Sequence, residues 1–104
     1  MDDLEKIVRI NNLYDLYKDL LTEKQRTYIE EYYFDNMSLA EISENHNISR
    51  NGVYSQLNLA IDELEKYENT LHLLEKNKKR EEIVEKIKDA KGDINALLDE
   101  LMEV

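Results

Sequence analysis

Apolar residues recur at intervals of three and four along most of the chain, which is the spacing of one buried face of an α-helix. The first such segment ends near Leu21 and predicts an amphipathic helix with a broad apolar face. Thr22 followed by Gln25 has the form of a capping box, so a second helix is expected over residues 23–34. The apolar positions of the first segment are Leu4, Ile7, Val8, Leu13, Tyr14, Leu16, Tyr17, Leu20 and Leu21. The inward face of the second helix is expected to carry Tyr28, Ile29, Tyr32 and Tyr33.

The middle of the chain has the pattern of a helix-turn-helix. Ser38 repeats the capping pattern with Glu41, which predicts a short helix over residues 39–46. Asn47 comes where the chain must turn sharply, and asparagine readily adopts the left-handed conformation that such a turn needs. Ser49 can cap the next helix, so cap, turn and apolar spacing agree on this motif. The buried positions of the turn and the third helix are expected to be Ile48, Val53, Leu57, Ala60 and Leu64.

The third helix is expected to continue far beyond the length of a recognition helix. No proline or glycine interrupts residues 53–79, and the apolar stripe continues over that length. An apolar stripe this long is expected to be buried against another apolar surface. The further positions of the stripe are Ile61, Leu64, Tyr67, Leu71 and Leu74.

The tail of the chain carries a heptad pattern, because its apolar residues alternate spacings of four and three. This segment can fold back on the stripe of residues 57–74 or pair with the same segment of a second chain, while Gly92 and Asp93 can end one helix and cap another. We favour a homodimer, with a helix-turn-helix domain over residues 1–68 and a dimerising helical extension over residues 69–104. The seam positions are Ile83, Ile87, Ala90, Ile94, Leu97, Leu101 and Val104.

Composition narrows the class of protein. The chain of 104 residues has no proline, no cysteine and only two glycines, which predicts an all-α fold without disulfides or cysteine-based zinc sites. A net charge of −10 opposes general attraction to nucleic acid, so any such role needs a local patch. Since no apolar run reaches the roughly 18 residues of a membrane span, we expect no membrane insertion and a cytoplasmic location.

A family resemblance is carried by LLTEKQRTYIEEYYFDNMSLAEISENHNISRNGVYSQLNLAIDELEKYE, residues 20–68. This stretch resembles the fourth region of bacterial sigma factors, and with the continuation EKYENTLHLLEKNKKRE the chain is more similar still to the YlxM family. The resemblance implies a sigma-region-four-like helix-turn-helix bundle with a long third helix and a helical tail. It also implies an accessory or regulatory role in the signal recognition particle pathway, because the family is encoded beside genes of that pathway.

The third helix departs from the sigma pattern in its charge. Sigma factors place several basic residues there, whereas Arg50 is the only cation before Lys66, which predicts weak binding to duplex DNA. The outer face of this helix can still contact base edges or a protein, or be a solvated polar face. The residues of that outer face are Arg50, Asn51, Tyr54, Ser55 and Asn58.

One basic cluster follows the motif. It can contact RNA or phosphate, but glutamates are interleaved with it, which favours ion pairs on the helix surface. The cluster consists of Lys76, Lys78, Lys79 and Arg80.

The sequence does not predict an enzyme. Neither histidine has a nucleophile at a recognisable spacing, and two glycines can hardly form a phosphate-binding loop. Glu68, His72 and Glu75 would share one face of a continuous helix, but such a trio on a charged helix is usually solvated, so no metal or cofactor is expected.

Two functions therefore remain from the sequence. The favoured one is a non-enzymatic accessory protein that binds a component of the signal recognition particle, either protein or RNA, through a helix-turn-helix scaffold. The alternative is a transcription regulator that binds DNA directly with the same motif.

Overall fold

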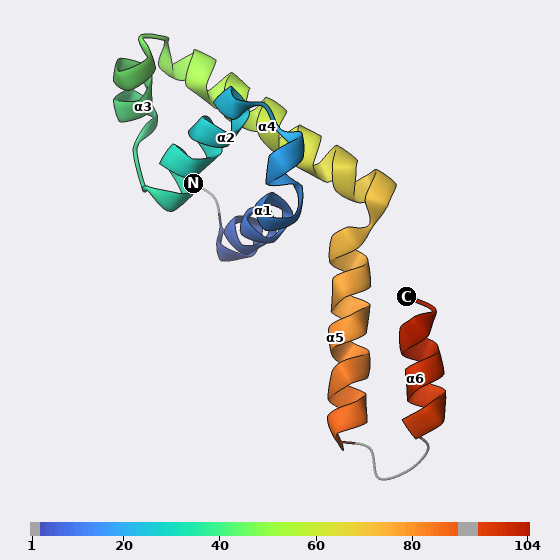
Figure 1. The fold of residues 1–104 in the computed structure, drawn as a ribbon. Helices are drawn as coiled ribbons and strands as arrows, with labels where there is room; N and C mark the ends of the chain where they lie inside the picture. Colours follow the sequence, from blue (N-terminus) through green and yellow to red (C-terminus); the bar gives the residue numbers. More distant parts are fainter. Residues whose placement is uncertain (1–2, 90–93) are drawn as a thin grey trace. The chain divides into compact units, whose positions relative to one another are not determined.

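The computed structural model describes residues 3–89 and 94–104, and the chain splits into two compact units, Met1–Thr70 and Leu71–Val104 (Figure 1). The described residues form helices, turns and loops without a strand, which confirms the predicted all-α class. None of the described helices is both long and apolar enough to cross a membrane.

The first unit begins with α1, Leu4–Tyr17, which ends in a short 3₁₀ turn, η1, Lys18–Leu20. The Asp3 side chain caps α1 by accepting from the Lys6 amide at 2.8 Å. The apolar face of α1 is narrower than its spacing predicted, because Leu4 and Val8 are 74% and 47% exposed, whereas Leu13 and Tyr17 are buried. Only the second half of the helix packs into the core.

The second helix does not stay α-helical to its end. The predicted capping box is present, with Thr22 accepting from the Gln25 amide and Gln25 accepting from the Thr22 amide, and α2 spans Glu23–Ile29. The chain then widens into a π-helical turn, η2, Glu30–Phe34, in which the Asp35 amide donates to the Glu30 carbonyl. Tyr32 and Tyr33 lie on this turn and are half-buried, so their predicted inward placement is met less completely than that of Tyr28 and Ile29, which are buried.

The helix-turn-helix consists of α3, Leu39–His46, and α4, Arg50–Leu71. The second predicted capping box is formed by Ser38 and Glu41. Asn47 has φ of 55°, as its place at the turn predicted, and the Ile48 amide donates to the Ser43 carbonyl across the helix end.

The core of the first unit lies between α1, α2, α3 and the buried face of α4. Burying one such aliphatic side chain contributes roughly 1.5–3 kcal/mol. Ile48 is only half-buried, whereas the other predicted core positions of α4 are buried. The largest side chains with almost no exposure are Leu13, Tyr17, Tyr28, Ile29, Ile42, Val53 and Leu64.

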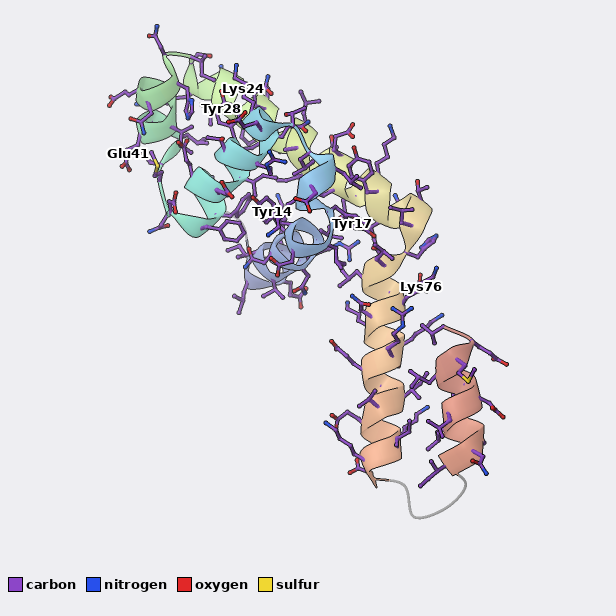
Figure 2. All side chains as sticks on the ribbon, in the orientation of Figure 1. Tyr14, Tyr17, Lys24, Tyr28, Glu41 and Lys76 are labelled. Atoms are coloured by element: carbon purple, nitrogen blue, oxygen red, sulfur yellow. The ribbon has the colours of Figure 1, made fainter. Side chains whose placement is uncertain are left out.

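Polar bonds tie α1 to the second half of α4. The Arg9 guanidinium donates twice to Glu65, at 2.7 and 2.8 Å. The Tyr17 hydroxyl donates to the Glu68 carboxylate at 2.7 Å, and both residues are buried. Figure 2 labels Tyr17. These bonds fix the angle at which α1 crosses the long helix.

The expected continuous helix from Ser49 to about Lys79 is wrong. The helix α4 ends at Leu71, and α5, Leu73–Asp89, begins after His72, whose φ is 56°. A left-handed residue interrupts the α-helical hydrogen bonds, and histidine is among the residues enriched in that conformation. The break therefore occurs without glycine or proline.

The second unit is a helical hairpin of α5 and α6, Ile94–Met102, which lie side by side (Figure 1). The heptad pattern is thus divided between two helices of one chain, and α6 packs back against α5. The predicted end and cap at Gly92 and Asp93, and the seam position Ala90, lie outside the described residues.

Candidate functional site

The start of α4 is fixed by its cap. The Ser49 hydroxyl accepts from the Gly52 amide at 2.9 Å, as the sequence predicted, and its carbonyl accepts from the Val53 amide at 3.0 Å. A Cβ atom on Gly52 would lie 3.2 Å from the Ser49 hydroxyl oxygen, so a larger residue would crowd the cap. This arrangement sets the direction of the side chains on the first turn.

The predicted outer residues of α4 do share one outward face, here called the α4 face. Arg50, Asn51, Tyr54 and Ser55 are exposed, and Asn58 is half-buried. Tyr54 is 59% exposed, a large exposed fraction for an aromatic side chain. Buried Val53 and Leu57 hold the opposite side of the helix in the core.

The charge of the α4 face differs from that of the rest of the chain. Residues 45–61 contain no carboxylate, although the whole chain has 24 aspartates and glutamates. Arg50 is the one arginine or lysine between residues 27 and 65, so the face is nearly neutral rather than strongly basic. The chemistry offered is hydrogen bonding by amides and a guanidinium, with one aromatic ring.

The predicted basic cluster lies on α5 in the second unit. All four of its side chains are exposed, and Figure 2 labels Lys76 near the start of the helix. Lys79 lies 3.7 Å from the Glu75 carboxylate, and the Arg80 guanidinium donates to the Asn77 side chain and to the Val104 carbonyl. The Glu75 carboxylate thus forms an ion pair on the helix surface with one cation of the cluster, as the alternation of charges predicted.

The predicted seam residues are brought together only in part. Ile83 is buried, Ile87, Leu97 and Leu101 are half-buried, and Ile94 is 45% exposed. Ile94 is therefore the least covered of these residues in the contact between α5 and α6 of one chain. The better covered ones are Ile83, Ile87, Leu97 and Leu101.

The three possible metal ligands, Glu68, His72 and Glu75, do not share one helical face. Glu68 lies buried in α4 and accepts from Tyr17, while His72 interrupts the helix and pairs with Glu75 at 3.3 Å. Within residues 3–89 and 94–104 no cluster of three or more potential ligand side chains could hold a metal ion.

A pocket that the sequence did not predict opens between α1, η2 and the start of α3. It has a volume of about 410 Å³, and its lining combines apolar and aromatic side chains with the polar residues Asn36, Ser38 and Glu41. Its lining residues are Ile7, Tyr32, Tyr33, Asn36, Met37, Ser38 and Glu41. Because the lining joins Ile7 on α1 to the stretch 32–41, helical spacing alone could not bring these residues together.

Short polar bonds hold the π-helical turn η2, which carries Tyr32 and Tyr33 of this tyrosine pocket. The His46 ring nitrogen Nε2 lies 2.8 Å from the Glu31 carboxylate, and the His46 ring packs edge-on to Tyr28 at 4.9 Å. The Tyr14 hydroxyl donates to Glu30 at 2.6 Å, and burial together with this bond raises the pKa of Tyr14. The π-helical turn is thereby anchored to both α1 and α3.

Comparison with known proteins gives one consistent result. A family model described as "Putative helix-turn-helix protein, YlxM / p13 like", UPF0122, matches residues 4–104. A UPF0122 protein of Geobacillus kaustophilus is 44% identical over 108 residues, covering 97% of this chain and 98% of the relative. A UPF0122 protein of Halalkalibacterium halodurans is 46% identical over 99 residues, covering 95% and 90%. One of Bacillus mycoides is 41% identical over 101 residues, covering 97% and 92%.

Proposed function

Because the chain belongs to the UPF0122 family of YlxM-like helix-turn-helix proteins, as its resemblance predicted, we propose that it is a non-enzymatic accessory protein of the signal recognition particle pathway. In this proposal it binds the RNA of the particle through the α4 face. The observation that carries the proposal is the exposed, carboxylate-free face of α4 in an otherwise acidic chain.

The chemistry of the α4 face suits an unpaired RNA loop better than a duplex. Sequence-specific RNA recognition relies on stacking of splayed bases and on hydrogen bonds to their edges, which Tyr54 and the amides of Asn51 and Asn58 can provide. Duplex binding depends more on phosphate neutralisation, and Arg50 alone supplies little of it.

The protein acts as a homodimer in this proposal, assembled through the hairpin. Ile94, Leu98 and Met102 follow one another at intervals of four on α6 and are 45%, 43% and 84% exposed. A second hairpin could cover this stripe. Leu98→Glu is expected to turn a dimer into a monomer in sedimentation velocity, whereas Leu59→Glu, at an exposed apolar position on α4, is not. A single monomeric species for the unmodified chain would contradict the dimer.

A transcription regulator is the second candidate, and one observation favours it. Arg50 and Asn51 lie in the first turn of the second helix of a helix-turn-helix, the position from which side chains reach base edges in the major groove. In that case the same two residues would bind a specific duplex.

The test is a salt titration of binding to three ligands: the signal recognition particle RNA, the GTPase of the particle, and duplex DNA of equal length. We expect retention of the RNA at moderate salt, and loss of about tenfold in affinity with Tyr54→Ala or Asn51→Ala, since one lost contact of about 1.4 kcal/mol is tenfold. Lys24→Ala is the matched control for Arg50→Ala, because Lys24 is an exposed cation on α2, labelled in Figure 2.

Each other outcome replaces the proposal by a stated alternative. Retention of DNA alone, lost with Arg50→Ala, would identify the transcription regulator. Retention of the GTPase alone would identify a protein-binding role for the motif. Binding of RNA that is unchanged in all α4-face variants would contradict the contact assigned to that face.

A further inference from the structure

The tyrosine pocket continues into an uncovered apolar surface. Ile7 lines the pocket, and Leu4 and Val8 beside it on α1 are 74% and 47% exposed. Tyr33 and Met37 form the opposite wall. Contiguous exposed apolar surface with a concave centre is typical of a binding site for a partner.

The surroundings of the pocket are acidic. Residues 27–49 contain five carboxylates and no lysine or arginine. Asp35, Glu41 and Glu44 are exposed, and Glu41 lines the pocket. Figure 2 shows Glu41 at the outer side of α3. The pocket thus has one carboxylate in its lining and further exposed carboxylates on the same stretch of chain.

We propose that the tyrosine pocket is a docking site for a cationic amphipathic helix of a partner protein. An apolar side chain of that helix would occupy the space between Ile7, Tyr33 and Met37, and its lysines or arginines would face Asp35, Glu41 and Glu44. Such helix-in-groove binding uses apolar anchors for affinity and charge complementarity for association rate and specificity.

Charge also distinguishes a cationic helix from two other ligands of an apolar pocket, a nucleic acid and a second copy of this chain. A nucleic acid would bring phosphates to an acidic surface, which is unfavourable. A second copy of this chain offers its exposed stripe on α6, but the described α6 carries Asp99 and Glu100 and no lysine or arginine. Its α5 does carry cations, but they alternate with Glu75, Glu81, Glu82 and Glu85, so that helix would also bring carboxylates to the acidic surface. A basic partner helix is the occupant that both the apolar centre and the acidic edge accept.

This site is separate from the α4 face and does not depend on the RNA contact proposed above. Its lining comes from α1, η2 and the start of α3, whereas the α4 face lies on the first turns of α4. Loss of one contact therefore leaves the other testable.

The experiment measures fluorescence anisotropy of a labelled peptide titrated with the full chain. The probe is an amphipathic helix of leucine and lysine of about 18 residues, which is five helical turns. Its control is a scrambled peptide of identical composition, because an acidic protein attracts any cationic peptide to some extent. We expect the amphipathic peptide to bind roughly tenfold more tightly than the scrambled one.

Two sets of variants separate the apolar and the charge contributions. Ile7→Gln and Met37→Gln are expected to weaken binding of the amphipathic peptide about tenfold each, while Leu59→Gln, an exposed apolar position on α4, has no effect. The triple variant Asp35→Asn, Glu41→Gln, Glu44→Gln is expected to weaken it by a similar factor. Glutamine at position 41 preserves the capping box, so this variant removes charge without removing the cap.

A second triple variant controls for the loss of net charge. Asp62→Asn, Glu81→Gln, Asp99→Asn removes the same net charge from exposed positions that do not line the pocket, and it is expected to leave affinity nearly unchanged. Equal losses in the two triple variants would overturn the site, since attraction would then follow net charge alone. Equal affinity for the two peptides would also overturn it.

Chemical-shift mapping on the isotope-labelled, unsubstituted chain keeps the proposal testable where a variant fails to fold. The amides of Ile7, Tyr33 and Met37 are expected to shift on addition of the amphipathic peptide, and that of Tyr54 is not. Shifts confined to the α4 face would overturn the proposal.

Discussion

The two compact units differ in how much of their apolar surface they cover. In Met1–Thr70, Leu13, Ile29 and Ile42 have no measurable exposure. In Leu71–Val104, the buried apolar residues among those described are Leu74 and Ile83, at 9% and 4%. The difference indicates that the first unit is stabilised mainly by its own core, whereas the hairpin retains apolar surface for contact with something else.

The two units also differ in the sequence separation and the exposure of their polar bonds. Arg9 with Glu65 and Tyr17 with Glu68 join residues 56 and 51 positions apart in the first unit. In the hairpin, Lys79 with Glu75 and Lys88 with Glu85 are exposed neighbours on one helix. The bonds of Arg80 to Val104 and of Lys86 to Glu100 are also exposed, and exposed pairs contribute little. All seven tyrosines lie in the first unit, so tyrosine fluorescence reports its unfolding separately.

The largest effect is expected from placing a charge at one buried apolar position of the first unit and at one exposed apolar position of the hairpin. Val53→Asp buries an unpaired carboxylate where exposure is 0%, and its cost of about 3–5 kcal/mol should unfold the helix-turn-helix. Leu98→Asp, at 43% exposure, is the matched control and should change the stability of the first unit by about 0.5 kcal/mol or less. Circular dichroism and tyrosine fluorescence on heating measure both. Retained helicity and melting temperature in Val53→Asp would contradict the placement of this residue.

A smaller effect is expected from the buried bond that joins α1 to α4. Tyr17→Phe removes one donor from the buried Glu68 carboxylate, and the loss should cost about 1–3 kcal/mol in urea unfolding. Tyr67→Phe removes an exposed bond from its hydroxyl to the Leu20 carbonyl and should cost less. Equal costs would show that burial does not decide the strength of these bonds.

The turn of the helix-turn-helix allows a test of about 1 kcal/mol. Asn47 has φ of 55°, which costs most L-residues roughly 1–2 kcal/mol, so Asn47→Ala should lower the free energy of unfolding of the first unit. Asn47→Gly should match or exceed the stability of the original chain, because glycine adopts this conformation freely. A greater stability of the alanine variant would mean that the turn has another conformation.

The smallest effect at neutral pH is expected at Tyr14, and it depends on pH. Its pKa in the folded state is raised above the ordinary value of 10.0 by burial and by the bond to Glu30. Below pH 10 both states keep the proton; above it the unfolded state releases the proton first, so stability falls as pH rises.

Comparison with Tyr14→Phe isolates this contribution. At neutral pH the variant should lose about 0.5–1.5 kcal/mol, because the bond to Glu30 is absent. As pH rises above 10 the difference between the two proteins should shrink, since phenylalanine does not ionise. A difference that grows with pH would contradict the raised pKa.

Local features of the fold were predictable from the sequence. The two capping boxes, the left-handed Asn47 and the Ser49 cap each depend on residues within four positions of one another. The outward placement of Arg50 and Tyr54 also followed, because helical spacing determines which side of α4 a residue occupies.

Features that depend on competition between arrangements were not predictable. The heptad pattern of the tail suits a hairpin within one chain as well as a pair of chains, so spacing could not choose α6 packed on α5. The break at His72 lacks glycine or proline, and the π-helical turn at Glu30–Phe34 leaves no signature in apolar spacing. The tyrosine pocket was missed for the same reason, although the lack of lysine and arginine in residues 27–49 was readable.

The bond between Tyr17 and Glu68 has a consequence for synthesis of the chain on the ribosome. The two residues are 51 positions apart, so α1 lacks this partner until nearly the whole first unit has been translated. At about 5–20 residues per second, that interval lasts roughly 3–10 s. During this time the apolar half of the first helix is a potential client for chaperones, and the nascent domain becomes complete only when the second half of α4 leaves the exit tunnel.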